Sequence, residues 1–171
     1  MELKLANNAI LAYQRLPYKP WYAMAEFVDN STDAYFRGNN KAILDESFEK
    51  TGDKLTVEIT YDKSDGILRI ADNSMGMSAA ELESAMIIGE KPLVTSGRSE
   101  FGMGMKTAGI WFADTIEIRT KKLGESQEVR TTIDIPSFVS GNAVLEVHTT
   151  AKPVDQHYTI IELRNLKRKL G

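Results

Sequence analysis

The hydrophobic period of the chain changes near residue 55, and this change limits the folds open to it. Upstream, apolar residues in the segment 20–37 recur at helical spacing, and "GNN" (38–40) follows as a stop signal. Downstream, "LTVEITYD" (55–62) and "GILRIAD" (66–72) alternate apolar and polar residues, as half-buried paired strands do. A chain that begins with helices and continues with strands has to bury the apolar face of one layer against the other.

The later segments fit the same plan. Ser78 and Glu81 form a capping-box pattern that predicts a helix over 78–89. Further helices are expected at 6–16 and 105–113, and further strands at 114–121, 127–135, 143–150 and 158–165. We therefore predict an α+β fold, a two-layer α/β sandwich with helices on one face of a mixed, mostly antiparallel sheet. With 171 residues, the whole chain, 1–171, is expected to form a single domain.

Composition excludes several classes of function. The net charge of −3 argues against a bare nucleic-acid-binding module, because such modules are usually basic. Cysteine is absent, and His148 and His157 are the only histidines, so a zinc site is disfavoured and both histidines are expected on strand surfaces. No apolar run reaches the roughly 18 residues of a membrane span. The N-terminus also lacks the apolar core of a signal peptide, so a cytoplasmic protein without a membrane partner is expected.

The helix predicted over 20–37 carries an unusual polar stripe. Glu26, Asn30 and Asp33 stand at positions i, i+4 and i+7 and share one face, with Asp29 on the flank. Apolar residues cover much of the remaining circumference, which is typical of a buried helix. The stripe then faces either a cavity that holds a ligand or, in the alternative that the helix alone leaves open, the solvent.

A second acidic position follows a strand, in "RIADNSMGMS" (69–78). Asp72 ends the strand, and Gly76 allows the backbone to bend or to be approached closely in the turn that follows. A carboxylate held in such a place suits a hydrogen bond from a ring amino group. An ordinary aspartate-containing turn is the alternative.

A third position combines glycines with a helix start. Gly102 and Gly104 stand directly before the helix expected at 105–113, and Lys106 lies in its first turn. Backbone N–H groups at a helix N-terminus bind phosphate, and glycines let the phosphate come close. A Walker A loop is excluded because Met103 occupies the lysine position, and a dinucleotide fingerprint is excluded because Thr107 stands at its third glycine.

In this order the motifs resemble the nucleotide-binding motifs of the GHKL superfamily, which includes gyrase B, the ninety-kilodalton heat-shock chaperones, histidine kinases, and MutL-type and MORC-like proteins. The segment "EFVDNSTDA" (26–34) matches every fixed position of the E-x-x-x-N-x-x-D-A motif. The segment "DNSMGM" keeps the aspartate, second glycine and methionine of the turn motif, but Ser74 replaces its first glycine. "FGMGMKTA" fits the phosphate motif, and "YTIIEL" (158–163) fits a late strand, so the resemblance covers about residues 20 to 165.

The resemblance implies the Bergerat fold and a role for each matching residue. Glu26 would be the general base, Asn30 would bind Mg²⁺, and Asp72 would accept from the adenine amino group with support from Thr159. Residues 78–101 would form a lid over ATP. The remaining residues implied to bind or surround the nucleotide are Asp33, Gly76, Met77, Gly102, Met103, Gly104, Met105 and Lys106.

For function, the resemblance implies Mg-dependent ATP binding and hydrolysis, coupled to conformational change or to ATP-dependent dimerisation in a longer protein. It identifies no protein or nucleic-acid client. Two alternatives remain open. One is a histidine- or serine-type protein kinase on the same fold, and the other is a nucleotide-sensing module with negligible turnover.

Overall fold

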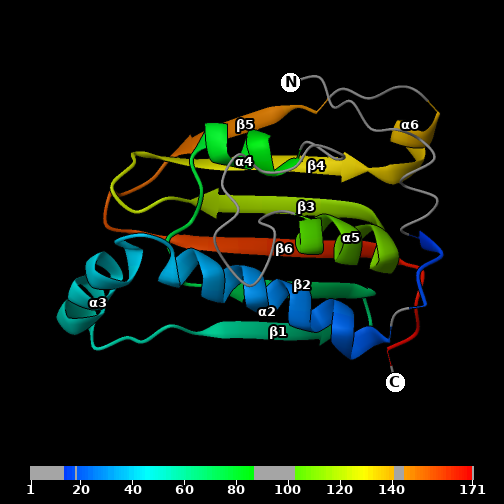
Figure 1. Ribbon diagram of the computed structural model, residues 1–171. Helices are drawn as coiled ribbons and strands as arrows, with labels where there is room; N and C mark the ends of the chain where they lie inside the picture. Colours follow the sequence, from blue (N-terminus) through cyan, green and yellow to red (C-terminus); the bar gives the residue numbers. More distant parts are fainter. Residues whose placement is uncertain (1–13, 18, 87–102, 141–144, 171) are drawn as a thin grey trace.

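The computed structural model describes residues 14–17, 19–86, 103–140 and 145–170 (Figure 1). The predicted helix at 6–16 therefore lies mostly outside the described residues, as does the predicted lid from residue 87 onward. The helices are α2 (Pro20–Phe36), α3 (Asn40–Thr51), α4 (Ala79–Met86), α5 (Met103–Phe112) and α6 (Ile135–Val139). The strands are β1 (Val57–Asp62), β2 (Ile67–Asp72), β3 (Ala113–Lys121), β4 (Gln127–Asp134), β5 (Val147–Ala151) and β6 (Tyr158–Leu166).

The strands form one six-stranded sheet in the order β1-β2-β6-β3-β4-β5. Every pair of neighbouring strands is antiparallel. The last strand, β6, lies between β2 and β3, so it joins the hairpin β1-β2 to the meander β3-β4-β5 (Figure 1). This strand order places the start of β6, at Tyr158, beside the end of β2, at Asp72.

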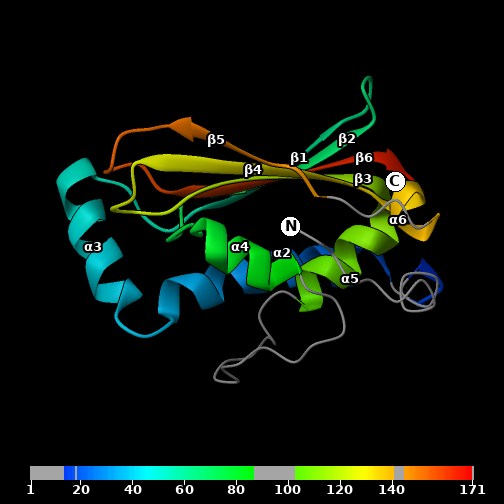
Figure 2. The ribbon, with the colours of Figure 1, turned by 90° about the horizontal axis from the view of Figure 1, so that it is seen from above.

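Helices α2, α4 and α5 lie on one face of this sheet (Figure 2). The face toward them is apolar, because Leu68 and Ile70 of β2 and Ile161 and Leu163 of β6 are buried in the main core. The α+β sandwich predicted from the sequence is confirmed, and it corresponds to the Bergerat fold. Within the described residues, no helix is both long enough and apolar enough to cross a bilayer.

The opposite face of the sheet carries charged side chains. Glu117 and Glu162 stand directly opposite each other on β3 and β6, an arrangement that like charges disfavour. Arginines on neighbouring positions compensate: Arg130 contacts Glu117 at 2.8 Å, and Arg164 contacts Glu162 at 2.7 Å. The sheet is therefore apolar toward the helices and ionic on its other side.

Helix α2 is less buried than its composition indicates. Its buried residues Ala23, Phe27 and Ser31 recur every four positions and face the sheet. Trp21, Tyr22 and Phe36 are each 59% exposed, so the expectation that apolar residues bury this helix over most of its circumference is wrong. Within the described residues, α2 packs against α5 and turns its buried side toward the sheet, while these three aromatic residues stay largely exposed.

Three local features bear on the predicted elements. The polar stretch after residue 40 forms α3, which buries Leu44 and Phe48 with Met75 in a small second cluster. The capping box is confirmed, because the Ser78 N–H donates to Glu81 and the Glu81 N–H donates to the Ser78 hydroxyl. The short helix α6 was not expected from the sequence.

The turn after β2 passes close to the end of β3. Gly76 has a φ of +72°, and a Cβ built on it would lie 2.0 Å from the carbonyl oxygen of Lys121. Both the left-handed backbone and the lack of space therefore require glycine here. Gly66, in the hairpin between β1 and β2, has a similar φ of +66° but open space around it.

Substitution of these two glycines distinguishes the effect of backbone strain from that of a steric clash. We predict that Gly66→Ala lowers the free energy of unfolding by about 1 kcal/mol, because only the left-handed conformation is penalised. Gly76→Ala should cost roughly 3 kcal/mol or more, because overpacking against Lys121 adds to the strain. Urea denaturation of both variants measures the difference, and equal losses would contradict the close approach to β3.

Candidate functional site

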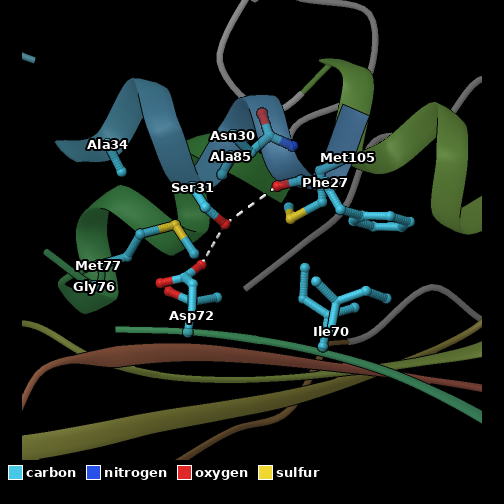
Figure 3. Close-up of a pocket in the computed structure, with 12 residues that line it drawn as sticks. Phe27, Asn30, Ser31, Ala34, Ile70, Asp72, Gly76, Met77, Ala85 and Met105 are labelled. Atoms are coloured by element: carbon cyan, nitrogen blue, oxygen red, sulfur yellow. Dashed lines mark hydrogen bonds between the residues drawn. The ribbon is translucent and has the colours of Figure 1, made fainter. Parts of the chain in front are cut away.

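A pocket opens between α2 and the sheet, beside α4 and α5 (Figure 3). Its walls are mostly apolar, and a small number of polar groups converge on it, as in many small-molecule sites. The lining residues are Phe27, Asn30, Ser31, Ala34, Ile70, Asp72, Gly76, Met77, Ala85, Met105, Thr159 and Ile161. Six predicted site residues are thus brought together: Asn30, Asp72, Gly76, Met77, Met105 and Thr159.

The carboxylate of Asp72 is the central polar group of this pocket. The Ser31 hydroxyl, from α2, donates to Asp72 Oδ2 at 2.6 Å (Figure 3). The backbone N–H of Ser74, from the following turn, donates to Asp72 Oδ1 at 2.9 Å. Each carboxylate oxygen therefore has a fixed donor, and the carboxylate keeps accepting capacity for a ligand.

Burial raises the pKa of Asp72 above its ordinary value. The hydrogen bonds from Ser31, Ser74 and the backbone of Thr159, together with the nearby His157, act in the opposite direction. A buried carboxylate costs free energy unless it is hydrogen-bonded, so these donors are what allow an acceptor to stand at this position.

Thr120 of β3 links the two other polar parts of the pocket. Its hydroxyl accepts from the Met77 N–H at 2.8 Å and lies 3.0 Å from the Thr159 hydroxyl. Thr159 is in turn the partner of Asp72 in the β2–β6 register. The turn that carries Gly76 and Met77 is thereby fixed to the strand that carries Thr159.

Glu26 and Asn30 follow each other by one turn on α2, about 6 Å along the helix axis. Asn30 reaches the pocket, whereas Glu26 and Asp33 are not among its lining residues. Burial, and then the negative charge of Asp29, raises the pKa of Glu26. Asp29 itself is exposed, so its effect on the site is through charge rather than contact.

Helix α5 brings the third predicted group near the pocket. It begins at Met103 and Gly104, and Met105 lines the pocket, whereas Gly102 lies outside the described residues. Lys106 is 6% exposed, and burial lowers its pKa to about 8. Burial disfavours the charged form of Lys106, and an anion that approaches the ammonium group would stabilise that form.

The donor set fits Mg²⁺ bound by one protein ligand. Asn30 offers an amide oxygen, a hard ligand of the kind that Mg²⁺ takes. The described part of the chain contains no cluster of three or more carboxylates or histidines that could hold a metal by itself. This composition suits an ion that keeps waters and substrate phosphates as its other ligands.

Sequence reasoning missed Ser31. The polar stripe of α2 stands out in the sequence by its charged and amide side chains. Ser31 is outside that stripe, on the buried side of α2, with Phe27 one turn before it. The available signal was a polar residue in the otherwise apolar series Ala23, Phe27, Ser31. Such a residue needs a partner, and strand β2 supplies it.

The expectation for the histidines holds for one of them. His148 lies on β5, and its side chain is 69% exposed. His157 is not a surface residue of a strand: it precedes β6, packs near Phe48 and contacts the turn after Asp72. The sequence could not show this contact, because strand order creates it.

Comparisons with known proteins agree with this geometry. Residues 18–164 match the family model described as "Histidine kinase-, DNA gyrase B-, and HSP90-like ATPase". The chaperone protein HtpG of Sulfurovum sp. is 25% identical over 153 residues, which cover 81% of this chain and 23% of that protein. HtpG of Alkaliphilus metalliredigens is 29% identical over 137 residues, covering 73% of this chain and 21% of the relative.

The chain therefore spans less than a quarter of the length of these curated relatives. The match to the family model, however, extends from before α2 to within β6 and includes all the pocket residues. The chain belongs to the family of histidine kinase-, DNA gyrase B- and HSP90-like ATPases.

Proposed function

We propose that this chain binds ATP together with Mg²⁺ and hydrolyses it, as the nucleotide-binding domain of a chaperone-like protein. In such a protein the nucleotide state would control conformation or dimerisation. The family, and the similarity to HtpG chaperones, support the proposal. The observation that carries it is the Asp72 carboxylate, held by Ser31 and Ser74 in a pocket with apolar walls.

The pocket suits adenine for a chemical reason. Adenine has an exocyclic amino group that donates hydrogen bonds, and Asp72 is an acceptor with fixed orientation. Guanine has a carbonyl oxygen at the corresponding ring position, and this oxygen would be repelled by the carboxylate. Apolar side chains such as Ile70, Met77 and Ile161 provide the surface on which a flat ring packs.

The remaining groups suit the phosphate end of the nucleotide. Glu26 would take a proton from the attacking water, and its raised pKa makes it a better base than an ordinary carboxylate. Asn30 would hold Mg²⁺, which supplies neutralisation of phosphate charge when bound. Lys106 would contribute a positive charge from the first turn of α5.

The adenine contact can be tested by Asp72→Asn. We expect this variant to bind ATP more weakly by roughly 1.5–3 kcal/mol, because a charge-assisted hydrogen bond is lost. Titration calorimetry of ATP and GTP measures the effect, and wild-type protein should prefer ATP. Unchanged affinity for ATP would refute the role of Asp72.

The general base can be tested by Glu26→Gln, with Asp29→Asn as the matched control on the same helix. Glu26→Gln should lower the turnover of ATP by about 10²-fold or more while affinity changes little, since the base acts only in the chemical step. Asp29→Asn should change turnover far less, because Asp29 is exposed and acts only through its charge. Phosphate release at saturating ATP is the measurement, and wild-type binding without turnover would favour the nucleotide-sensing alternative.

The pKa of Lys106 predicts a proton linkage. Below about pH 8 the ammonium is already charged; above it, the free protein holds neutral lysine, and phosphate binding must restore the proton. ATP affinity should therefore fall as pH rises above about 8, with net proton uptake on binding. Calorimetry at about pH 8.5 in two buffers of different ionisation enthalpy measures the uptake.

Lys106→Met should abolish this uptake, whereas Lys50→Met, an exposed lysine of α3, should leave it unchanged. Equal uptake in wild type and Lys106→Met would place the titrating group elsewhere.

A further inference from the structure

The turn after β2 contains one peptide unit that orients the Asp72 carboxylate. The N–H of Ser74, which donates to Asp72 Oδ1 at 2.9 Å, belongs to the same planar peptide group as the carbonyl of Asn73. Any contact that fixes the Asn73 carbonyl oxygen therefore also fixes the direction in which the Ser74 N–H points.

His157 makes such a contact. Its Nδ1 lies 2.9 Å from the carbonyl oxygen of Asn73 and 2.9 Å from that of Ser74. Carbonyl oxygens only accept, so Nδ1 carries the hydrogen and donates to both. The imidazole is held in place by the ring of Phe48, with centroids 5.7 Å apart.

Asn73 is also fixed from the other side. Its side-chain Oδ1 accepts from the Thr56 N–H at 2.7 Å, and its Nδ2 donates to the Lys54 carbonyl at 2.9 Å. The peptide unit between Asn73 and Ser74 is thus held between the segment 54–56 and His157. The segment 54–56 bonds the side chain and the N–H of Asn73, whereas the contact to the Asn73 carbonyl oxygen comes from His157.

We propose that His157 is a positioning residue for nucleotide recognition. Its Nδ1–H orients the Asn73–Ser74 peptide unit, whose N–H in turn keeps the Asp72 carboxylate directed into the pocket. A hydrogen bond to the carbonyl also polarises the peptide unit and strengthens its N–H as a donor. The inference rests on the proposed binding of ATP, because it assigns a role at the same carboxylate.

Two substitutions separate the hydrogen bond of His157 from its packing. His157→Phe keeps a ring against Phe48 but removes the donor. His157→Asn loses the ring but places an amide nitrogen, Nδ2, at the position of Nδ1. His148→Phe is the matched control, because His148 is exposed on β5 and far from Asp72 in the sheet order.

We expect ATP affinity to fall when the hydrogen-bond donor at the position of Nδ1 is removed, and to be retained when a donor is kept there. His157→Phe should bind ATP about tenfold more weakly, the equivalent of one hydrogen bond. His157→Asn should stay within about threefold of wild type, as should His148→Phe. In steady-state kinetics KM should rise in His157→Phe while kcat is retained, because Glu26 and Lys106 are unchanged.

A second readout does not need nucleotide. In NMR spectra of the free protein, the Ser74 amide proton should shift upfield and exchange faster in His157→Phe, and both effects should be reversed in His157→Asn. Thermal unfolding shows that each variant is folded. The proposal is overturned if His157→Phe leaves the Ser74 amide unchanged, or if His157→Asn is as impaired as His157→Phe.

These outcomes are distinct from failure of the proposed function. If wild-type protein does not bind ATP, the proposed function is wrong, yet the Ser74 amide still decides whether His157 orients this peptide unit. If ATP binds and depends on Asp72 but not on His157, only the positioning role is wrong.

Discussion

The insertion of β6 between β2 and β3 is the constraint on which the rest of the molecule depends. This strand, formed by Tyr158–Leu166, pairs with both neighbours and completes the apolar face beneath the helices. Its register also places Thr159 beside Asp72 on one side and beside Thr120 on the other. The pairing of β6 with β2 and β3 therefore contributes both to the core and to the pocket.

A row of polar residues crosses this otherwise apolar face at the pocket. Asp72, Thr159 and Thr120 occupy paired positions on β2, β6 and β3. Thr120 is buried and Asp72 and Thr159 are half-buried, so each needs hydrogen-bond partners, and the structure supplies them from α2, from the turn after β2 and from within the row. The result is a fixed acceptor surrounded by apolar walls, which suits the ring amino group of the proposed nucleotide.

Helix α2 connects packing with chemistry. Phe27 anchors it in the core, Ser31 bonds the carboxylate of the sheet, and Asn30 reaches the pocket between them. Glu26 lies one turn earlier, where burial first and the charge of Asp29 second raise its pKa, and this gives Asp29 an influence on the site through its charge. Because one rigid helix carries both residues, helix geometry sets the separation along the axis of Glu26 and Asn30, the proposed base and the proposed metal ligand.

Much of this protein was determined by local sequence. The change of hydrophobic period predicts the two layers, and the capping box predicts the start of α4. The nucleotide-binding motifs indicate the family. Each of these patterns depends on residues that are close together in the chain. Tertiary structure alone decided what those residues contact. Ser31 has a partner 41 residues away, and His157 contacts a carbonyl 84 residues away. Likewise, the exposure of Trp21 depends on which side of α2 the sheet covers. Such contacts follow from the strand order, which places segments far apart in the chain side by side and is not encoded by any local pattern.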